Sequence, residues 1–234
     1  MNKNLSVILC TYNEAKIINK TIDEIFFYNP NSEIIIVDDN STDQTQKIIK
    51  EKNLENVKLI TRKRRGLASA CLVGLLYANY ENICWIDSNL PDLAKKIPLM
   101  IKNLEKDKDN IVIMSRYVDG GADYRSKQRI LSSKIINYFC RLFLNSKIKD
   151  YTSGIFAIKK EILINVSPIC YGHGEYFIEF IYKASKLNYN IVELPYQQPA
   201  DIEGISKTTG SLFRFFVLGI NYFIRIIIAK IRVN

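Results

Sequence analysis

The sequence has few of the side chains that build zinc centres and disulfide frameworks. It contains one histidine, His173, and five cysteines, which sit in apolar contexts and never at CxxC spacing. Zinc sites need several His or Cys ligands at short spacings, and disulfide frameworks need paired cysteines in an oxidising compartment. Neither is expected, and a reducing cytosolic compartment fits the cysteine usage best.

The sequence also lacks the glycine-rich motifs that bind phosphates. No GxGxxG follows the first apolar segment, and no GxxxxGK[ST] occurs in the chain. These motifs bring backbone N–H groups against a dinucleotide or a triphosphate. Dinucleotide binding and P-loop chemistry are therefore disfavoured, and a nucleotide would have to be held in another way.

Long apolar runs are missing as well. Residues Met1–Asn4 lead straight into a strand pattern, without the apolar region and cleavage site of a secretory signal, so export of the body of the protein is not expected. The apolar run between Arg214 and Arg225 is shorter than the ~20 residues that cross a bilayer, which disfavours a spanning helix.

Positive charge is abundant. The chain has 33 basic and 24 acidic residues, giving a net charge of +9, which suits nucleic acid, an anionic membrane surface or a phosphorylated substrate. The basic run Arg62-Lys63-Arg64-Arg65 has no interleaved aromatic residues and no accompanying nucleic-acid motif. We therefore expect no nucleic-acid partner, and a solvated loop or one lying over a diphosphate instead.

A cluster of polar side chains follows the apolar run Ile34–Val37. Asp38, Asp39 and the segment Asn40–Asp43 stand where this predicted strand ends. Ligands of open α/β sheets bind at the carboxyl ends of strands. Capping of the next helix would explain one of these residues, but the two adjacent acids before the cap favour a site.

Short apolar runs alternate with segments of helical periodicity through the first half of the chain. This alternation predicts an α/β fold with a mostly parallel sheet and a Rossmann-like nucleotide-binding half. The expected strands are Leu5–Cys10, Glu33–Val37, Val57–Ile60, Ile83–Ile86 and Ile111–Met114. The expected helices are Ala15–Phe27, Asp43–Lys52, Leu67–Tyr80 and Leu93–Leu104, with a further amphipathic helix at about Glu175–Leu187.

Several motifs together resemble the inverting family 2 glycosyltransferases and, within them, the polyprenyl-phosphate (dolichol-phosphate mannose-type) sugar synthases. The motifs typical of the whole family are Ser6-Val7-Ile8-Leu9-Cys10-Thr11-Tyr12-Asn13-Glu14, Val37-Asp38-Asp39-Asn40-Ser41-Thr42-Asp43 and Arg65-Gly66-Leu67. Those typical of the subgroup are Ser115-Arg116-Tyr117-Val118-Asp119-Gly120-Gly121, then Arg129, Ser133 and Asn137, Asp150-Tyr151-Thr152-Ser153-Gly154, Val192-Glu193-Leu194-Pro195, and Gly204, Ser206 and Lys207. The resemblance covers nearly the whole chain.

The resemblance implies a GT-A fold, a nucleoside-diphosphate sugar donor of the GDP-mannose or UDP-hexose type, a polyprenyl phosphate acceptor, and a divalent Mg²⁺ or Mn²⁺ ion. The donor-binding residues that it implies are Tyr12, Glu14, Asp39, Asp87, Ser88, Asn89 and Arg116, and the metal ligands are Asp87 and Asn89. Arg129, Ser133 and Lys207 would bind the acceptor phosphate. The catalytic set is Asp87, Arg116, Arg129 and Lys207.

Two departures from the family pattern stand out. The family usually shows Asp-Ala-Asp-Leu-Gln at the metal site, and this chain has Asp87-Ser88-Asn89-Leu90-Pro91. Asp87, the Asn89 carbonyl and a diphosphate still offer the oxygen ligands that hard cations prefer, but with weaker affinity. Asp201 stands where the family usually places an arginine, which reverses a charge near the expected phosphates.

A lipid phosphate acceptor is already ionised at neutral pH, so the implied reaction needs no strong general base. This leaves His173, in a glycine-flanked turn, as a structural or exposed residue rather than a base. Glu179 matches an acidic position of the family, and its role stays open.

The C-terminal segment predicts an amphipathic helix. Between Leu212 and Val233 the segment is strongly apolar, and four of its polar residues fall on one narrow helical stripe. Such a helix can lie in a membrane interface with its arginines at the headgroups. The stripe consists of Arg214, Asn221, Arg225 and Arg232. A core-packed or dimer-forming helix is the competing interpretation.

These expectations combine into a GT-A domain over residues 1–208 and a membrane-interfacial helix over residues 209–234. The hypothesis is a glycosyltransferase peripheral to the cytoplasmic face of a membrane. Two alternatives remain: the same fold with a saccharide or other acceptor, and a nucleotide- or partner-binding protein with impaired catalysis. Donor base, sugar and oligomeric state are not specified by the sequence.

Overall fold

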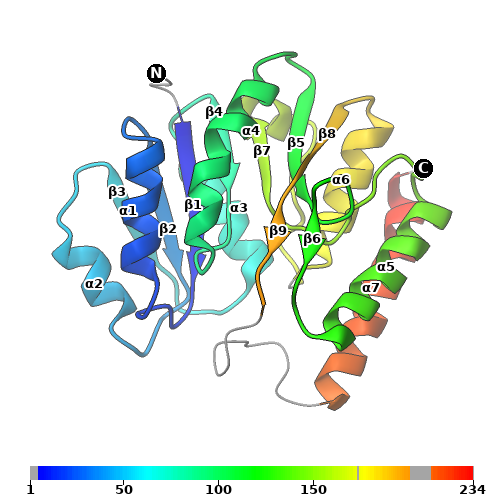
Figure 1. Cartoon of the computed structure of the whole chain (residues 1–234), viewed down its shortest axis with the longest axis horizontal. Coiled ribbons are helices and arrows are strands. Elements are labelled where there is room, and N and C mark those ends of the chain that lie inside the picture. Colours follow the sequence, from blue (N-terminus) through cyan, green and yellow to red (C-terminus); the bar gives the residue numbers. More distant parts are fainter. Residues whose placement is uncertain (1–4, 173, 201–211, 234) are drawn as a thin grey trace. The chain divides into compact units, whose positions relative to one another are not determined.

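The computed structural model describes residues 5–172, 174–200 and 212–233, with side chains from residue 219 onward in the last range. The chain divides into two compact units. The first comprises Met1–Val112 and Ile155–His173, and the second comprises Ile113–Gly154 and Gly174–Asn234. Each contributes its own strands and helices (Figure 1).

The first unit is built on parallel strands in the order β3-β2-β1-β4, with β7 antiparallel at the side of β4. The strands are β1 (Leu5–Thr11), β2 (Glu33–Asp38), β3 (Val57–Thr61), β4 (Asn82–Trp85) and β7 (Phe156–Lys159). The side chains of Val7 and Ile8 in β1 and of Ile34 and Ile35 in β2, which point to opposite faces of the sheet, have no exposed surface. Burial on both faces explains why these strands are continuous apolar runs rather than alternating ones.

Helices follow these strands, as the periodicity predicts. They are α1 (Ile18–Tyr28), α2 (Thr45–Glu51), α3 (Leu67–Tyr77) and α4 (Ile97–Leu104), with 3₁₀ turns at Pro91–Lys96 and Lys160–Ile164. Helix α3 packs on β1 and β2, closely enough that a side chain on Gly74 would collide with Ile8, and Figure 1 draws α1 in front of the same strands.

Two helices, α1 and α4, begin three or more residues later than the sequence predicts, each for a local reason. Before α1, the Glu14 carbonyl accepts hydrogen bonds from the N–H groups of Ile17 and Ile18, so a tight turn precedes the helix. Before α4, the chain forms the 3₁₀ turn, and Pro98 then occupies the first turn of the helix, where its missing N–H costs nothing.

The second unit combines three helices with short strands. They are α5 (Lys127–Phe143), α6 (Tyr176–Lys186), α7 (Leu212–Val233), β6 (Ala122–Asp123), β8 (Asn190–Pro195) and β9 (Gln197–Gln198), together with the end of β5 (Asn110–Ser115). Strand β8 neighbours β5, and β6 pairs in parallel with β9. Helix α7 packs against both α5 and α6.

The predicted α/β fold class with a C-terminal helix is confirmed. Within the ranges that the structure describes, no helix combines the length and the apolar character needed to cross a bilayer.

Candidate functional site

The two acids at the end of β2 have different roles. Asp38 is fully buried and accepts hydrogen bonds from the Thr11 hydroxyl, the Ser41 backbone and hydroxyl, and the Gln46 amide. Its oxygens are therefore occupied by the loop and by α2. Asp38 holds the backbone in place, and Asp39 is the carboxylate that the loop presents.

The loops that follow β1 and β2 are joined to each other. The Asn13 N–H donates to the Ser41 hydroxyl at 2.9 Å, and the Thr42 N–H donates to the Asn13 side-chain oxygen at 2.8 Å. Asn13 and Asn40 have φ values of 55° and 59°, a left-handed conformation that Asn adopts more readily than most residues. Asp43 accepts hydrogen bonds from the N–H of Thr45, the first residue of α2, and from the N–H of Ala15, so contacts with the backbone explain this acid.

Asp39 is held by the loop between β3 and α3. The Arg62 Nε donates to Asp39 Oδ1 at 2.7 Å, and the Gly66 N–H donates to Oδ2 at 2.7 Å. Arg62 also donates to the Ser69 hydroxyl and the Gly66 carbonyl. A carboxylate offers about four lone-pair directions, so an oriented Asp39 can still accept from a ligand.

Tyr12 lies against the same loop. The Arg65 guanidinium stands over its ring, 3.5 Å from the centroid, which is a cation–π contact. Tyr12 and Asp39 therefore each have a partner from the segment Arg62–Gly66. This loop is not simply solvated: it orders two of the residues that the sequence assigns to the donor.

The turn after β4 carries the predicted metal ligands. The Ser88 hydroxyl donates to the Cys10 carbonyl at 2.8 Å, and the Thr21 hydroxyl donates to the Ser88 carbonyl at 2.7 Å. Ser88 therefore anchors the turn to β1 and α1, while Asn89 is exposed beside it. Burial raises the pKa of the Cys10 thiol, the Asp39 and Asp87 carboxylates raise it further, and the Arg62 guanidinium lowers it.

The turn offers a hard cation one carboxylate, Asp87, and the amide oxygen of Asn89. Among the described residues there is no group of three or more His, Cys, Asp or Glu side chains able to hold a metal ion. The donor set still fits Mg²⁺ or Mn²⁺ in kind, because these ions accept water and substrate phosphate oxygens as further ligands. Asp87 and Asn89 would hold such an ion jointly with a diphosphate.

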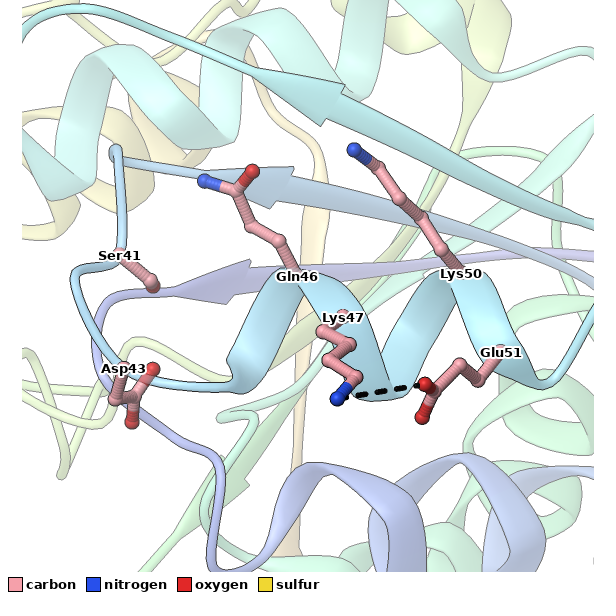
Figure 2. A pocket seen from close by; sticks show the side chains of 6 residues that line it. All are labelled: Ser41, Asp43, Gln46, Lys47, Lys50 and Glu51. Carbon is pink, nitrogen blue, oxygen red and sulfur yellow. Dashed lines mark ion pairs between the residues drawn. The ribbon is translucent and has the colours of Figure 1, made fainter.

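A separate pocket of about 470 Å³ lies along α2 and the loop that precedes it (Figure 2). It is lined by Ser41, Asp43, Gln46, Lys47, Lys50 and Glu51. Its polar groups are largely engaged within the protein: Ser41 and Gln46 bind Asp38, and Lys47 pairs with Glu51 at 3.8 Å. None of the predicted site residues lines this pocket.

The second unit contains a buried ion cluster around Arg116. Its guanidinium binds both oxygens of Asp150, at 2.8 and 2.7 Å, and lies 3.6 Å from Asp123, which Arg125 also binds. Burial opposes ionisation of Asp150, but Arg116 and backbone hydrogen bonds outweigh it and lower the pKa of Asp150 below its ordinary value of 3.8. Arg116 thus has carboxylate partners within the protein, and its predicted role toward substrate phosphates stays a prediction.

Ser133 belongs to a hydroxyl network beside this cluster. Its hydroxyl accepts from the Tyr117 hydroxyl at 2.9 Å and lies 2.9 Å from the Thr152 hydroxyl, which accepts from Arg116 and Asn137. The steps of four from Arg129 to Ser133 and Asn137 place these residues on adjacent turns of α5. Lys207, Asp201, Gly204, Ser206 and His173 lie outside the described residues.

Glu179 receives the role that the sequence left open, and the expected orientation of α7 is wrong. Arg225 Nη1 lies 2.9 Å from Glu179 and Arg232 Nη1 lies 3.1 Å from it, while the buried Arg225 Nε has no hydrogen-bond partner. Arg225 is therefore turned into the protein rather than toward headgroups. The physical reason is the buried carboxylate on α6, which needs a counter-ion.

The sequence analysis named Asp39 and Arg116 as site residues, but it did not identify the side chains that form ion pairs with them. Arg62 was noted only as part of a basic run, and Asp150 only as part of a motif. The position of Arg62 directly after the strand that neighbours β2 was the one signal in the sequence for its pairing with Asp39. No local signal pairs Arg116 with Asp150, 34 positions away.

Strand-end carboxylates joined by the loops of a parallel sheet are typical of open α/β proteins, whose ligands bind at the carboxyl ends of the strands. The family described as glycosyl transferase family 2 matches residues 6–167. The chain belongs to this family, as the motifs in its sequence predict.

Two characterised relatives are similar to most of the chain. The dolichol-phosphate mannosyltransferase of Pyrococcus furiosus is 32% identical over 215 residues, which is 88% of this chain and 59% of the relative. The polyprenol monophosphomannose synthase of Mycolicibacterium smegmatis is 28% identical over 218 residues, which is 89% of this chain and 82% of the relative. The chain thus spans less than two thirds of the first relative's length.

Solved structures show the same fold. Glucosyl-3-phosphoglycerate synthase from Mycobacterium tuberculosis, in complex with UDP, superposes with a TM-score of 0.74 at 18% identity, covering 97% of this chain and 80% of that one. Its complex with Mn²⁺, UDP and glucosyl-3-phosphoglycerate gives a TM-score of 0.73 at 17% identity, with the same coverage. The GT-A fold implied by the sequence is confirmed.

Asp39→Asn is expected to weaken nucleotide binding about tenfold. Loss of the charge weakens a hydrogen bond to the ligand and also releases Arg62, and hydrogen bonds to charged groups contribute about 1.5–3 kcal/mol. Calorimetric titration with UDP and with GDP measures this. Asp23→Asn, at an exposed acid on α1, is the matched control. Equal affinities for the Asp39 variant and the parent would remove Asp39 from the site.

Proposed function

We propose that this protein is a glycosyltransferase that moves a sugar from a nucleoside-diphosphate sugar to a polyprenyl phosphate. The observation that carries the proposal is the similarity, over 88–89% of the chain, to relatives named for transfer to dolichol phosphate or to a polyprenol. The strand-end groups of the first unit and the Ser133 network of the second supply residues of the expected kinds.

In the proposed reaction an oxygen of the acceptor phosphate attacks the anomeric carbon of the sugar. A bond forms between that carbon and the phosphate oxygen as its bond to the leaving diphosphate breaks, and the configuration inverts. The attacking oxygen is already ionised, so no side chain has to remove a proton. Charge neutralisation of the departing diphosphate is the chemistry that a cation held by Asp87 and Asn89 would supply.

The residues divide the remaining work. Tyr12 and Asp39, ordered by the Arg62–Gly66 loop, bind and orient the nucleoside. Arg129 and Ser133 near the start of α5 bind the acceptor phosphate, with Lys207 as a further cation. Fixed charges of this kind stabilise developing negative charge without reorganisation. The protein acts at the cytoplasmic face of a membrane, with α7 in the interface.

The test is transfer of radiolabelled sugar from a panel of nucleoside-diphosphate sugars to polyprenyl phosphate in detergent, with Mn²⁺, Mg²⁺ or chelator. Metal-dependent lipid product supports the proposal and identifies the donor. Transfer only to a saccharide in the same assay would assign a different acceptor. Nucleotide binding without any transfer would indicate a nucleotide-binding protein without catalytic activity. The observation that favours this alternative is Asn89, which stands where the family has a carboxylate.

A further inference from the structure

Three hydroxyl groups meet beside the ion cluster around Arg116. The Tyr117 hydroxyl donates to the Ser133 hydroxyl at 2.9 Å, and the hydroxyl oxygens of Ser133 and Thr152 are also 2.9 Å apart. A hydroxyl has one hydrogen to donate and two lone pairs that accept. The donors that each oxygen receives therefore determine where its own hydrogen points.

The Thr152 hydroxyl oxygen already accepts two hydrogen bonds. Arg116 Nη2 donates to it at 2.7 Å, and Asn137 Nδ2 donates to it at 2.9 Å. A guanidinium has no acceptor atom, and the amide of Asn137 is fixed in orientation because its oxygen accepts from the backbone N–H of Tyr151 at 2.6 Å. Both lone pairs of Thr152 are thus filled, so Thr152 cannot accept a further hydrogen bond from Ser133.

The hydrogen of the Thr152 hydroxyl points to Ser133. Its two candidate acceptors are the Ser133 oxygen at 2.9 Å and Asp150 Oδ1 at 3.2 Å. Two hydroxyl oxygens at this distance with no hydrogen between them would repel each other, and Asp150 Oδ1 already accepts from Arg116 at 2.7 Å. The Ser133 oxygen therefore accepts from both Thr152 and Tyr117, and its two lone pairs are filled as well.

Tyr117 keeps the hydrogen that it donates to Ser133. Burial raises the pKa of Tyr117 above its ordinary value of 10, and the opposing effects of the Arg116 guanidinium and the Ser133 hydrogen bond do not cancel this rise. The phenol is therefore protonated at neutral pH, and Tyr117 remains a donor.

The hydrogen of Ser133 itself has no acceptor among the residues that the structure describes. The residue is 7% exposed, and buried hydroxyls normally have hydrogen-bond partners. The two donors at its lone pairs fix the direction of its O–H bond. They keep the hydroxyl from turning to the carbonyl four residues earlier in α5, an acceptor that helical serines commonly use. Ser133 thus offers a ligand one oriented donor.

We infer that Tyr117 and Thr152 are positioning residues for the acceptor, because they hold the Ser133 hydroxyl so that its hydrogen is donated to an ionised phosphate oxygen. Such an oxygen accepts hydrogen bonds and offers none, so it matches a hydroxyl that can only donate. A saccharide hydroxyl would bring a hydrogen of its own, for which Ser133 has no lone pair left. The inference rests on the proposed function for the identity of the acceptor.

The experiment uses the full chain and geranyl phosphate, a short water-soluble polyprenyl phosphate. Initial rates of sugar transfer give the acceptor KM, and titration calorimetry gives the Kd. Ser133→Ala is expected to raise both about tenfold or more, because a hydrogen bond to a charged oxygen is lost. Tyr117→Phe keeps the ring and is expected to raise both about threefold, because the Ser133 hydroxyl can then turn away. The KM for the donor should change in neither variant.

Two further comparisons separate positioning from a general loss of structure. If Tyr117 acts through Ser133, adding Tyr117→Phe to Ser133→Ala should raise the KM and the Kd no further, whereas independent effects would multiply. Thr152→Ser keeps the hydroxyl and should bind geranyl phosphate like the parent, whereas Thr152→Val should bind it severalfold more weakly. Tyr138→Phe, which removes the hydroxyl of a 63% exposed side chain on α5, is the matched control. Circular dichroism confirms that each variant is folded.

Failure of this inference is distinguishable from failure of the proposed function. Transfer by Tyr117→Phe with the acceptor KM of the parent would overturn the positioning role and leave the reaction standing, as would an equal effect of Tyr117→Phe with and without the Ser133 hydroxyl. Binding of geranyl phosphate that depends jointly on Tyr117 and Ser133, without transfer to any acceptor, would refute the reaction and leave the positioning role standing. A parent protein that does not bind geranyl phosphate would overturn both.

Discussion

Asp150→Asn is expected to lower the free energy of unfolding by about 3–5 kcal/mol. The Arg116 and Asp150 side chains are 2% and 0% exposed, so the substitution leaves a guanidinium buried without its main counter-charge. Removing one partner of a buried ion pair costs this much because the remaining charge has neither water nor a partner. Asp123, 3.6 Å from Arg116, compensates only in part because Arg125 shares it.

Urea denaturation followed by circular dichroism measures the effect. Arg64→Ala, at an exposed arginine of the first unit, is the control and should change the free energy of unfolding by less than about 0.5 kcal/mol. A change below about 1 kcal/mol for Asp150→Asn would contradict a dry, tightly paired cluster. Such a result would also support an orientation in which the Arg116 guanidinium faces the substrate.

The ion cluster around Arg116 makes the free energy of unfolding depend on pH in the acidic range. The pKa values of Asp150 and Asp123 are lowered in the folded protein, so the unfolded chain binds their protons first as the pH falls. Their stabilisation is complete above about pH 4 and is lost as the pH falls through the folded pKa values. Burial raises the pKa of Glu193, so this residue has the opposite effect. Its contribution to the free energy of unfolding is lost as the pH rises. Asp150→Asn should therefore flatten the acid limb alone.

Asp87→Ala is expected to reduce sugar transfer by about 100-fold or more. Asp87 is the one carboxylate of the predicted metal site, and electrostatic stabilisation of a leaving diphosphate is worth several kcal/mol, each 1.36 kcal/mol being tenfold in rate. Initial rates at saturating donor and acceptor, with Mn²⁺ varied, measure the loss. Asp92→Ala, at an exposed acid five residues along, should leave the rate unchanged.

Asn89→Asp gives the complementary result. Restoring a carboxylate beside Asp87 should tighten Mn²⁺ binding in the presence of nucleoside diphosphate, which titration calorimetry measures independently of turnover. No gain in Mn²⁺ affinity would show that Asn89 is not a ligand. Full activity of Asp87→Ala across the Mn²⁺ range would remove Asp87 from the metal site altogether.

The parallel strands were predictable because burial on both faces leaves a continuous apolar signal, as in Ile34–Val37. Family motifs then located the residues that stand at the strand ends. The resemblance assigned Asp39 rather than Asp38 to the donor, but local patterns alone could not distinguish the two acids, because Asp38 is engaged by hydrogen bonds from Thr11, Ser41 and Gln46. Contacts between side chains far apart in the chain are outside the reach of local patterns.

Helix α7 shows the same limit more sharply. Its polar stripe follows from helical spacing, but amphipathicity alone does not say which side of the helix faces the protein. The decision lies with Glu179, a buried carboxylate on a different helix. A helix with a few arginines among many isoleucines is predicted to contact lipid headgroups through its arginines, whereas here Arg225 and Arg232, with side chains 11% and 59% exposed, both pair with Glu179.

The clamp on Glu179 also fixes how α7 can turn. Two arginines one heptad apart grip a single carboxylate, so rolling the helix about its axis would withdraw both charges at once and leave Glu179 buried alone. The two ion pairs with Glu179 therefore favour one angle of rotation of α7 about its own axis. Moving the arginine pair by one position along α7 would re-aim its whole apolar side by about 100° without changing its composition.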